Sequence, residues 1–368
     1  MSRTLAAVAA LLLAAPAAHA SGWKLANEDS MSINYFQGLT HTPGGDMLFI
    51  GPSQGAWRTD PNLKQLAGNA SIYPSNVAAI GFNHAGDPTY DPSEGGRLLA
   101  PMECYHPELA PQPANTCGIG GFGVINPVDL TWKYWVRLDQ ADIPKAMWAE
   151  VSPDHTLVWT SSGNDLLAYR TADITQANAA TSASSPPIHP VQRLTGAVPP
   201  SGVTGAVFVG GRMLLAGDVD GLLQVRSVDL TGKTPTRTEI ELPGINAESE
   251  GLDLIDMRGG TLHWILSPFV DKPTFGAGHT ELMTFLPAAQ AALHLRPVRH
   301  GHGARVRVFT HFNGSDHPVG GATVALGEAH TKTSASGVVS FAHVPASAQH
   351  VHATKLQLSG TATLPKAG

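Results

Sequence analysis

The sequence predicts an all-β protein, and three observations support this. At five places along the chain, a glycine pair or a Pro-Asp turn leads into a short apolar run. These turns begin at residues 44, 95, 153, 210 and 259, so successive turns lie 51, 58, 57 and 49 residues apart. The chain is also rich in turn formers, with 39 Gly and 28 Pro in 368 residues. A repeat of this length suits one four-stranded sheet per unit, which favours a β-propeller of five or six blades.

The first twenty residues have the pattern of an export signal. Arg3 supplies a positive charge, residues 6–15 are apolar, and Ala18-His19-Ala20 forms a small-x-small cleavage site. The apolar run is too short to span a bilayer, and no later run approaches eighteen uninterrupted apolar residues. We therefore expect a signal peptide at 1–20 and a mature chain without a membrane span, either secreted, periplasmic or at the cell surface.

The charge balance argues against one class of partner. The net charge is −6 and only 14% of the residues are charged. Nucleic-acid-binding domains concentrate lysine and arginine on one face, and this chain has no such concentration. We expect the partner to be an extracellular protein, a glycan or a small molecule.

The two cysteines, Cys104 and Cys117, are predicted to form a disulfide. An isolated pair this close in an exported chain is typical of a structural bridge. A two-cysteine metal site is the alternative, and the lack of a Cys-x-x-Cys spacing argues against it.

The repeats place one sheet each at about 31–70, 76–140, 144–195, 202–243 and 247–288. Each sheet should be an up-and-down meander whose innermost strand precedes the turn. We expect the β-propeller to cover 21–290, with a sixth degenerate blade or closure by residues 21–30 as open alternatives.

The composition changes after residue 290, and residues 296–368 predict a separate domain. Residues 305–310 alternate polar and apolar side chains, as a half-buried strand does. With Gly321-Ala322-Thr323-Val324 and Gly337-Val338-Val339-Ser340-Phe341, this segment resembles small bacterial immunoglobulin-like and carboxypeptidase-regulatory-like modules. That resemblance implies an immunoglobulin-like β-sandwich that serves as a spacer or a binding appendage.

The repeat pattern and the phrase Glu248-Ser249-Glu250-Gly251-Leu252 resemble secreted bacterial propellers of the lactonase-like and senescence-marker-like superfamily. The metal-ligand set of the lactonases in that group has no full match here. The resemblance therefore implies the fold and does not extend to lactonase activity.

Three units place a polar residue before a glycine on the innermost strand. These pairs are Gln37-Gly38, Thr204-Gly205 and Glu250-Gly251. Inner strands converge on a central channel, where glycine permits close backbone approach and the preceding side chain can face the lumen. Their oxygens suit a calcium ion, and hydrogen bonding to channel water is the alternative.

Two long connections, 101–121 and 267–280, should lie at the same mouth of the channel. Long ordered loops in compact domains are often functional. They carry Glu103, Tyr105, His106 and His279, which with Glu250 are the candidate acids, bases and ligand-binding groups. Asp218 and Asp220 resemble the start of a calcium loop, although tight-turn chemistry explains an Asp-Gly pair equally well.

These observations leave three functions open, and one of them is a purely structural component of the cell envelope. The first is an exported binding protein whose loop-rich channel face binds an extracellular protein or glycan, with Glu250 as the central acidic group. The alternative is a hydrolase or lyase that acts there on a small ester, lactone or saccharide, with calcium as an open cofactor. No complete catalytic motif decides between them.

Overall fold

The computed structural model describes residues 22–51, 55–106, 114–198, 202–219, 221–231, 236–242, 245, 247–268, 279–345 and 347–366. Within these ranges nearly all regular structure is β, as the sequence predicted. The helical segments are short, and they are η1 (Ile33–Tyr35), α1 (Ser75–Ala78), η2 (Ser93–Gly95), η4 (Thr171–Asp173) and η5 (Gln176–Asn178).

Five antiparallel sheets make up the larger part of the described chain. The first four follow the sequence order. The first sheet contains β2 (Gly38–His41), β3 (Met47–Ile50), β4 (Ala56–Thr59) and β5 (Gln65–Asn69). The second sheet contains β6 (His84–Ala85), β7 (Thr89–Asp91), β8 (Arg97–Glu103), β11 (Gly121–Ile125) and β12 (Trp132–Arg137). The third sheet contains β13 (Glu150–Val151), β14 (Leu157–Ser162), β15 (Asp165–Arg170) and β16 (Gln192–Leu194), and the fourth contains β17 (Gly205–Val209), β18 (Arg212–Val219), β19 (Leu222–Val228) and β20 (Arg237–Leu242).

The fifth sheet joins the two ends of the repeat region. It contains β21 (Ala247–Met257), β22 (Gly260–Pro268) and β23 (His279–Pro287), and its outermost strand is β1 (Trp23–Ser32). β1 runs antiparallel to β23 from Trp23 opposite Pro287 to Ser32 opposite His279. The sequence left open that residues 21–30 close the ring of sheets. The pairing of β1 with β23 is a closure of this kind.

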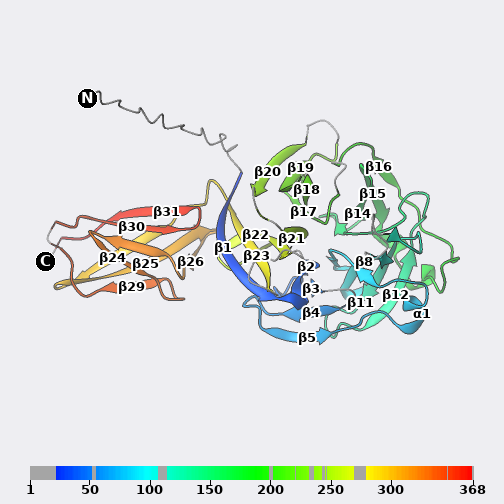
Figure 1. Cartoon of the computed structure of the whole chain (residues 1–368), viewed down its shortest axis with the longest axis horizontal. Coiled ribbons are helices and arrows are strands. Elements are labelled where there is room, and N and C mark those ends of the chain that lie inside the picture. The colour runs from blue at the N-terminus through cyan, green and yellow to red at the C-terminus, as the bar shows by residue number, and fades with distance from the viewer. Residues whose placement is uncertain are drawn as a thin grey trace, which may run out of the picture.

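The five sheets stand around a common centre (Figure 1). The innermost strands are β2, β7, β13, β17 and β21, and each contacts the next around a closed circle. Apolar side chains fill the wedges between neighbouring sheets. For example, Phe122 of the second sheet meets Tyr169 of the third edge to face, with ring centroids 5.8 Å apart. Such buried wedges hold the sheets in a ring because each sheet covers the apolar face of its neighbour.

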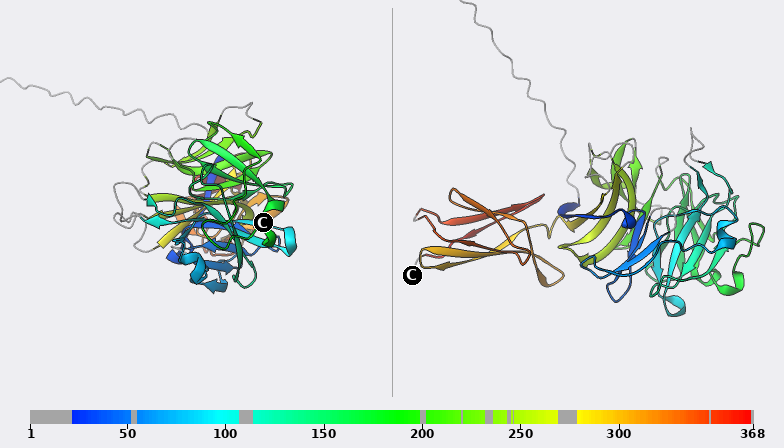
Figure 2. Two further views of the ribbon diagram at one scale, coloured as in Figure 1. Left: turned by 90° about the vertical axis from the view of Figure 1, so that its right-hand side faces the viewer. Right: turned by 60° about the horizontal axis from the view of Figure 1, so that its bottom comes forward.

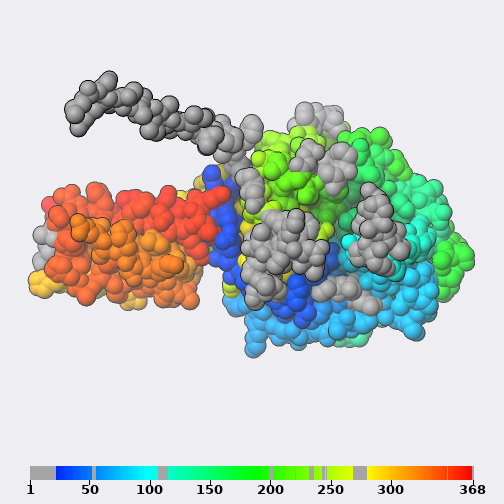
Figure 3. Space-filling model, in the orientation of Figure 1, coloured from blue at the N-terminus to red at the C-terminus, as the bar shows by residue number. Residues whose placement is uncertain are grey.

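The C-terminal strands form a separate lobe beside the ring (Figures 1 and 3), and its long axis leads away from the fifth sheet (Figure 2). Two four-stranded sheets enclose one core that includes Val306, Val324 and Val351. The same core takes in Ala26 of β1 and Leu286 of β23, so the lobe packs directly on the fifth sheet. Its strands are β24 (His294–His300), β25 (Gly303–Phe312), β26 (Ser315–Pro318) and β29 (Val338–Phe341), facing β27 (Thr323–Leu326), β28 (Ala329–Lys332), β30 (His350–Lys355) and β31 (Leu358–Thr363).

Cys104 and Cys117 form a disulfide, with their Cα atoms 5.8 Å apart, and this confirms the predicted bridge. The bridge closes the connection that follows β8. That connection also contains a short hairpin of β9 (Tyr105–His106) and β10 (Ala114–Asn115). No helix in the described ranges is long and apolar enough to cross a membrane.

Candidate functional site

The centre of the ring is organised by Asp87, which lies between β6 and β7 and is completely buried. Its Oδ1 accepts a hydrogen bond from the backbone N of Leu39 at 2.9 Å. Its Oδ2 accepts longer bonds, both of 3.4 Å, from the backbone N of Ala206 and of Leu252. One carboxyl group therefore contacts the inner strands β2, β17 and β21.

The backbone of Asp87 links the remaining inner strand. Its N donates to the carbonyl of Met147 at 3.0 Å, and its carbonyl accepts from Ala149 N at 3.0 Å, just before β13. Asp87 and Trp148 form a parallel bridge. The residue thus connects its own sheet to all four of the others.

Three glycines allow this close approach. A Cβ atom at Gly38 would lie 2.4 Å from Asp87 Cα, and one at Gly251 or Gly205 would lie 2.7 or 2.9 Å from an Asp87 carboxyl oxygen. These are the glycines of the three polar-Gly pairs, so the expected backbone approach is present. The sequence interpretation missed its partner, Asp87. Burial raises the pKa of this carboxyl well above its ordinary value, although the N–H groups of Leu39 and Leu252 oppose that shift.

β2 and β21 run past Asp87 in the same direction, so the centre of the ring has two ends. Gln37 and Glu250, which precede the glycines, meet on one side of Asp87, and His41 and Asp253, which follow them, meet on the other. We call the side of Gln37 and Glu250 the first end and the opposite side the second end.

At the first end, Gln37 Nε2 donates to Glu250 Oε2 at 2.9 Å, and both side chains are buried. Thr204 is next to this pair without joining it. Its Oγ1 donates to the hydroxyl of Ser249 at 2.9 Å, and Trp264 Nε1 also donates to that hydroxyl, at 3.0 Å. Two of the three channel residues therefore converge directly, and the third reaches them through the neighbour of Glu250.

A β-bulge in β21 sets the direction of Glu250. Ser249 pairs with Leu266 and Leu252 pairs with Trp264, so Glu250 and Gly251 together face the single residue Ile265. A bulge of this kind bends a strand and re-aims a side chain. The Glu-Gly pair marks this place in the sequence, but the bulge itself was not predicted.

A second carboxylate, Glu103 at the end of β8, is also buried at this end. Its Oε1 lies 2.9 Å from His84 Nδ1, and its Oε2 lies 3.7 Å from Lys145 Nζ. The His84 ring in turn lies 5.0 Å from the ring of Tyr105. The sequence interpretation named Glu103 and Tyr105 but missed His84 and Lys145, because neither stands in a motif.

The two buried glutamates differ in their protonation chemistry. Burial raises the pKa of Glu250 well above its ordinary value, and the carboxyl groups of Glu248, Asp87 and Glu103 add to the shift. Burial alone would also raise the pKa of Glu103, but His84 and Lys145 together lower it below the ordinary value. The first end thus holds one carboxyl group whose pKa is raised, Glu250, and one whose pKa is lowered, Glu103.

Tyr105 lies close enough to Glu103 and Glu250 for their charges to affect its pKa. Burial raises the pKa of its phenol, and the charges of Glu248, Glu103 and Glu250 raise it further. Glu248 itself is exposed at the rim, and its pKa is raised by partial burial and by Asp218. The acidic residues Glu103, Glu248 and Glu250 therefore all lie near the phenol of Tyr105.

The remaining residues predicted for the site are His106, Asp218, Asp220 and His279. His106 is half-buried in β9, and Asp218 Oδ1 accepts a hydrogen bond from Gly221 N at 2.9 Å, as a tight turn requires. Asp220 and the side chain of His279 lie outside the described residues, as do 107–113 and 269–278 of the two connections. Whether these residues contribute to the site stays a prediction.

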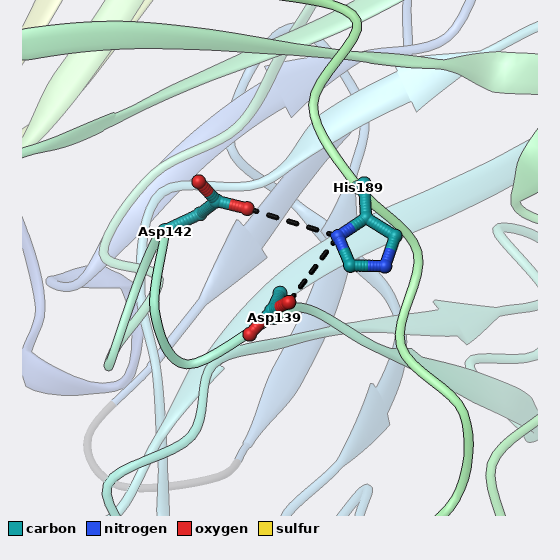
Figure 4. Close-up of side chains that lie close together, drawn as sticks. All are labelled: Asp139, Asp142 and His189. Atoms are coloured by element: carbon teal, nitrogen blue, oxygen red, sulfur yellow. Dashed lines mark ion pairs between the residues drawn. The ribbon is translucent and has the colours of Figure 1, made fainter.

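Another cluster of possible metal ligands lies at the rim of the third sheet (Figure 4). His189 Nδ1 is 3.2 Å from Asp139 and 3.9 Å from Asp142. Arg193 already pairs with Asp142 at 2.6 Å and with Asp165 at 2.9 Å, so the cluster is an exposed ion-pair network. It is the sole group of three or more close ligand atoms in the described ranges, and it does not include Glu250 or Asp218. Calcium binding by these two residues stays a prediction.

No protein-family description matches the chain, and no curated protein resembles it. Among solved structures, a glutaminyl cyclase of Myxococcus xanthus is 10% identical, with 72% of this chain and 96% of that chain covered and a TM-score of 0.42. A complex of KlAtg21 with the coiled coil of AgAtg16 is 14% identical, with 60% and 62% covered and a TM-score of 0.32.

Proposed function

We propose that this protein is an exported glycan-binding protein, built as a five-bladed β-propeller with an immunoglobulin-like module at its C-terminus. The closed circle of five inner strands supports the propeller, and the two facing sheets of residues 294–363 support the module. The pattern of residues 1–20 supports export. The ligand binds at the first end of the channel.

The convergence of Glu250 with Gln37 carries the assignment of the site. These two side chains come from β21 and from just before β2, and their 2.9 Å hydrogen bond holds the carboxyl in place. Glu103 and its partner His84 provide a second fixed polar pair nearby. Binding sites fix their ligands with a few convergent polar groups of this kind.

The chemistry of the first end suits a glycan better than a charged or apolar ligand. A sugar presents many hydroxyl groups, each of which donates and accepts hydrogen bonds. Carboxyl and amide groups can satisfy both roles, and the half-buried ring of Tyr105 offers a flat surface for a sugar face. The disulfide of Cys104 adjoins Tyr105 in the chain and restrains the backbone there.

One observation favours hydrolysis of the glycan as a second candidate function. Glycosidases use one carboxylic acid with a raised pKa to protonate the leaving group and one ionised carboxylate as base or nucleophile. Glu250 and Glu103 have this contrast of pKa directions. If the protein is a hydrolase, Glu250 donates the proton to the leaving group and Glu103 acts as the ionised base or nucleophile.

Calorimetry with cello-, chito- and malto-oligosaccharides tests the proposal, and 4-nitrophenyl glycosides test the hydrolytic candidate. We expect Glu250→Gln to weaken oligosaccharide binding at least tenfold with little change in the melting temperature. The matched control is Glu241→Gln, which alters an exposed glutamate on the outer strand β20. Binding that is unaltered in Glu250→Gln, or no binding of any oligosaccharide by the wild type, refutes the glycan site. Turnover that is lost in both Glu250→Gln and Glu103→Gln would favour the hydrolase.

A further inference from the structure

A pocket of about 410 Å³ opens at the second end of the channel. All five inner strands line it, and the residues they contribute include His41, Thr89, Glu150, Phe208 and Asp253. Asp87, which contacts the inner strands between the two ends, separates this pocket from Glu250. The pocket is therefore distinct from the proposed glycan site.

Two carboxyl groups form the floor of this pocket. Asp253 is buried, and its two oxygens lie 2.9 and 3.1 Å from His41 Nδ1. Glu150 accepts hydrogen bonds from Thr89 Oγ1 at 3.1 Å and from the backbone N of Phe208 at 3.2 Å. No lysine or arginine is among the described residues that line the pocket. The floor thus combines two acids with a histidine as its basic partner.

The spacing of these groups argues against a preformed metal site. The ligand atoms of Glu150, Asp253 and His41 do not all lie within 4.8 Å of one another. The pocket of about 410 Å³ that these residues line has room for a ligand larger than a bare ion. The lining also includes the apolar side chains of Pro43, Pro153, Val207 and Leu254, which we call the apolar wall.

We propose that this pocket binds a small organic ammonium cation, with the charged nitrogen between Glu150 and Asp253 and the hydrocarbon part against the apolar wall. His41 is bonded to Asp253, so ionising the enclosed Glu150 is costly unless a further cation lies beside it, and an ammonium group that pairs with Glu150 gains strongly from the contact. The apolar wall adds the burial of hydrocarbon surface. A neutral ligand of the same shape would gain only from the burial of its hydrocarbon surface.

The protonation state of the pocket is consistent with this ligand. Burial raises the pKa of Glu150 to about 8, and the charge of Asp253 adds to the rise, while His41 opposes it. For His41, burial alone would lower the pKa, but Asp253 and Glu150 raise it above the ordinary value. The other titratable groups near Glu150 are Asp87 and the pocket residues Tyr90 and His155. At neutral pH Glu150 is mostly protonated, so a bound cation must displace its proton.

Proton release gives the proposal a specific signature. If the cation binds ionised Glu150, its apparent affinity rises about tenfold from pH 6 to pH 7, because the ionised fraction rises by that factor. Binding at pH 7 then releases close to one proton. Titration calorimetry of benzylammonium in two buffers with different heats of ionisation measures that number, and benzyl alcohol serves as the neutral probe of similar shape.

We expect Glu150→Gln to abolish the proton release and most of the pH dependence, and Asp253→Asn to weaken benzylammonium binding at least tenfold. The matched control is Asp316→Asn in the C-terminal lobe, which should leave both quantities unchanged. If Asp253→Asn does not fold, Glu150→Gln carries the test, with circular dichroism to confirm its fold. No saturable binding of benzylammonium, equal affinity for benzyl alcohol, or proton release retained in Glu150→Gln would overturn the proposal.

Discussion

The carboxyl group of Asp87 should be among the largest single contributors to the stability of the ring. Asp87→Ala removes the acceptor of one normal hydrogen bond, from Leu39 N at 2.9 Å, and of two long ones, from Ala206 N and Leu252 N at 3.4 Å. A buried backbone donor that loses its acceptor costs about 1–3 kcal/mol. We take about 2 kcal/mol for the short bond and about 1 kcal/mol for each long one, which gives a loss of about 4 kcal/mol.

A loss of this size is easy to measure. Domains of this length change their melting temperature by about 2–4 °C for each kcal/mol, so Asp87→Ala should melt about 10 °C below the wild type. Differential scanning calorimetry of the whole chain makes the comparison, with the transition of the ring followed separately from that of the C-terminal lobe. A change of less than about 2 °C would refute the view that Asp87 holds the inner strands together.

The pH dependence of Asp87→Asn provides a second, independent check. The pKa of Asp87 is raised in the folded protein, mainly by burial. Between its unfolded and folded pKa values the folded state binds more protons, so this group's contribution to stability falls as the pH rises. Asparagine does not titrate, so the stability difference between wild type and Asp87→Asn should shrink from pH 5 to pH 8. A difference that widens over this range would contradict the direction of the pKa shift.

Three further predictions concern the frame around the sites. Cys104→Ala should lower the free energy of unfolding by about 2–4 kcal/mol in urea, and mass spectrometry of the unreduced wild type should find no free thiol. Arg97→Lys should lower the free energy of unfolding by about 3 kcal/mol, because the buried guanidinium lies 2.7 Å from Asp91 and a lysine cannot keep its forked contacts. The exposed control, Arg193→Lys, should lower it by less than about 1 kcal/mol. A fragment of residues 288–368 should show its own cooperative melt, at a lower temperature than in the full chain because it loses the packing on the fifth sheet; a disordered far-UV spectrum would show that the lobe depends on the ring.

The sequence by itself determined the local features of this protein. Turn residues recur at a regular spacing, and each turn is followed by the strand it predicted. The alternation of residues 305–310 became the half-buried strand β25, because neighbouring side chains of a strand must point to opposite faces. The disulfide was also predictable, since two cysteines in one short connection have no other partner.

Part of the first end could be predicted in the same way. The pairs Gln37-Gly38 and Glu250-Gly251 stand at equivalent positions of their repeats, and equivalent positions of a ring come together at its centre. The direct contact between Gln37 and Glu250 follows from that symmetry. The contact of Thr204 with Ser249 does not, because a one-residue bulge in β21 shifts the register there.

Only the tertiary structure decided the rest of both sites. Asp87 is an ordinary Gly-Asp-Pro residue in the sequence, yet its carboxyl meets strands that lie 48, 119 and 165 residues away. His41 and Asp253 are 212 residues apart and form the ion pair of the second end. Local patterns carry no signal for such pairs, because their contact depends on the closure of the ring by β1 and on how far each strand reaches into the channel. Burial in the ring then shifts the pKa values of these carboxyl and imidazole groups. The chemistry of both sites therefore depends on the whole fold and not on any single segment.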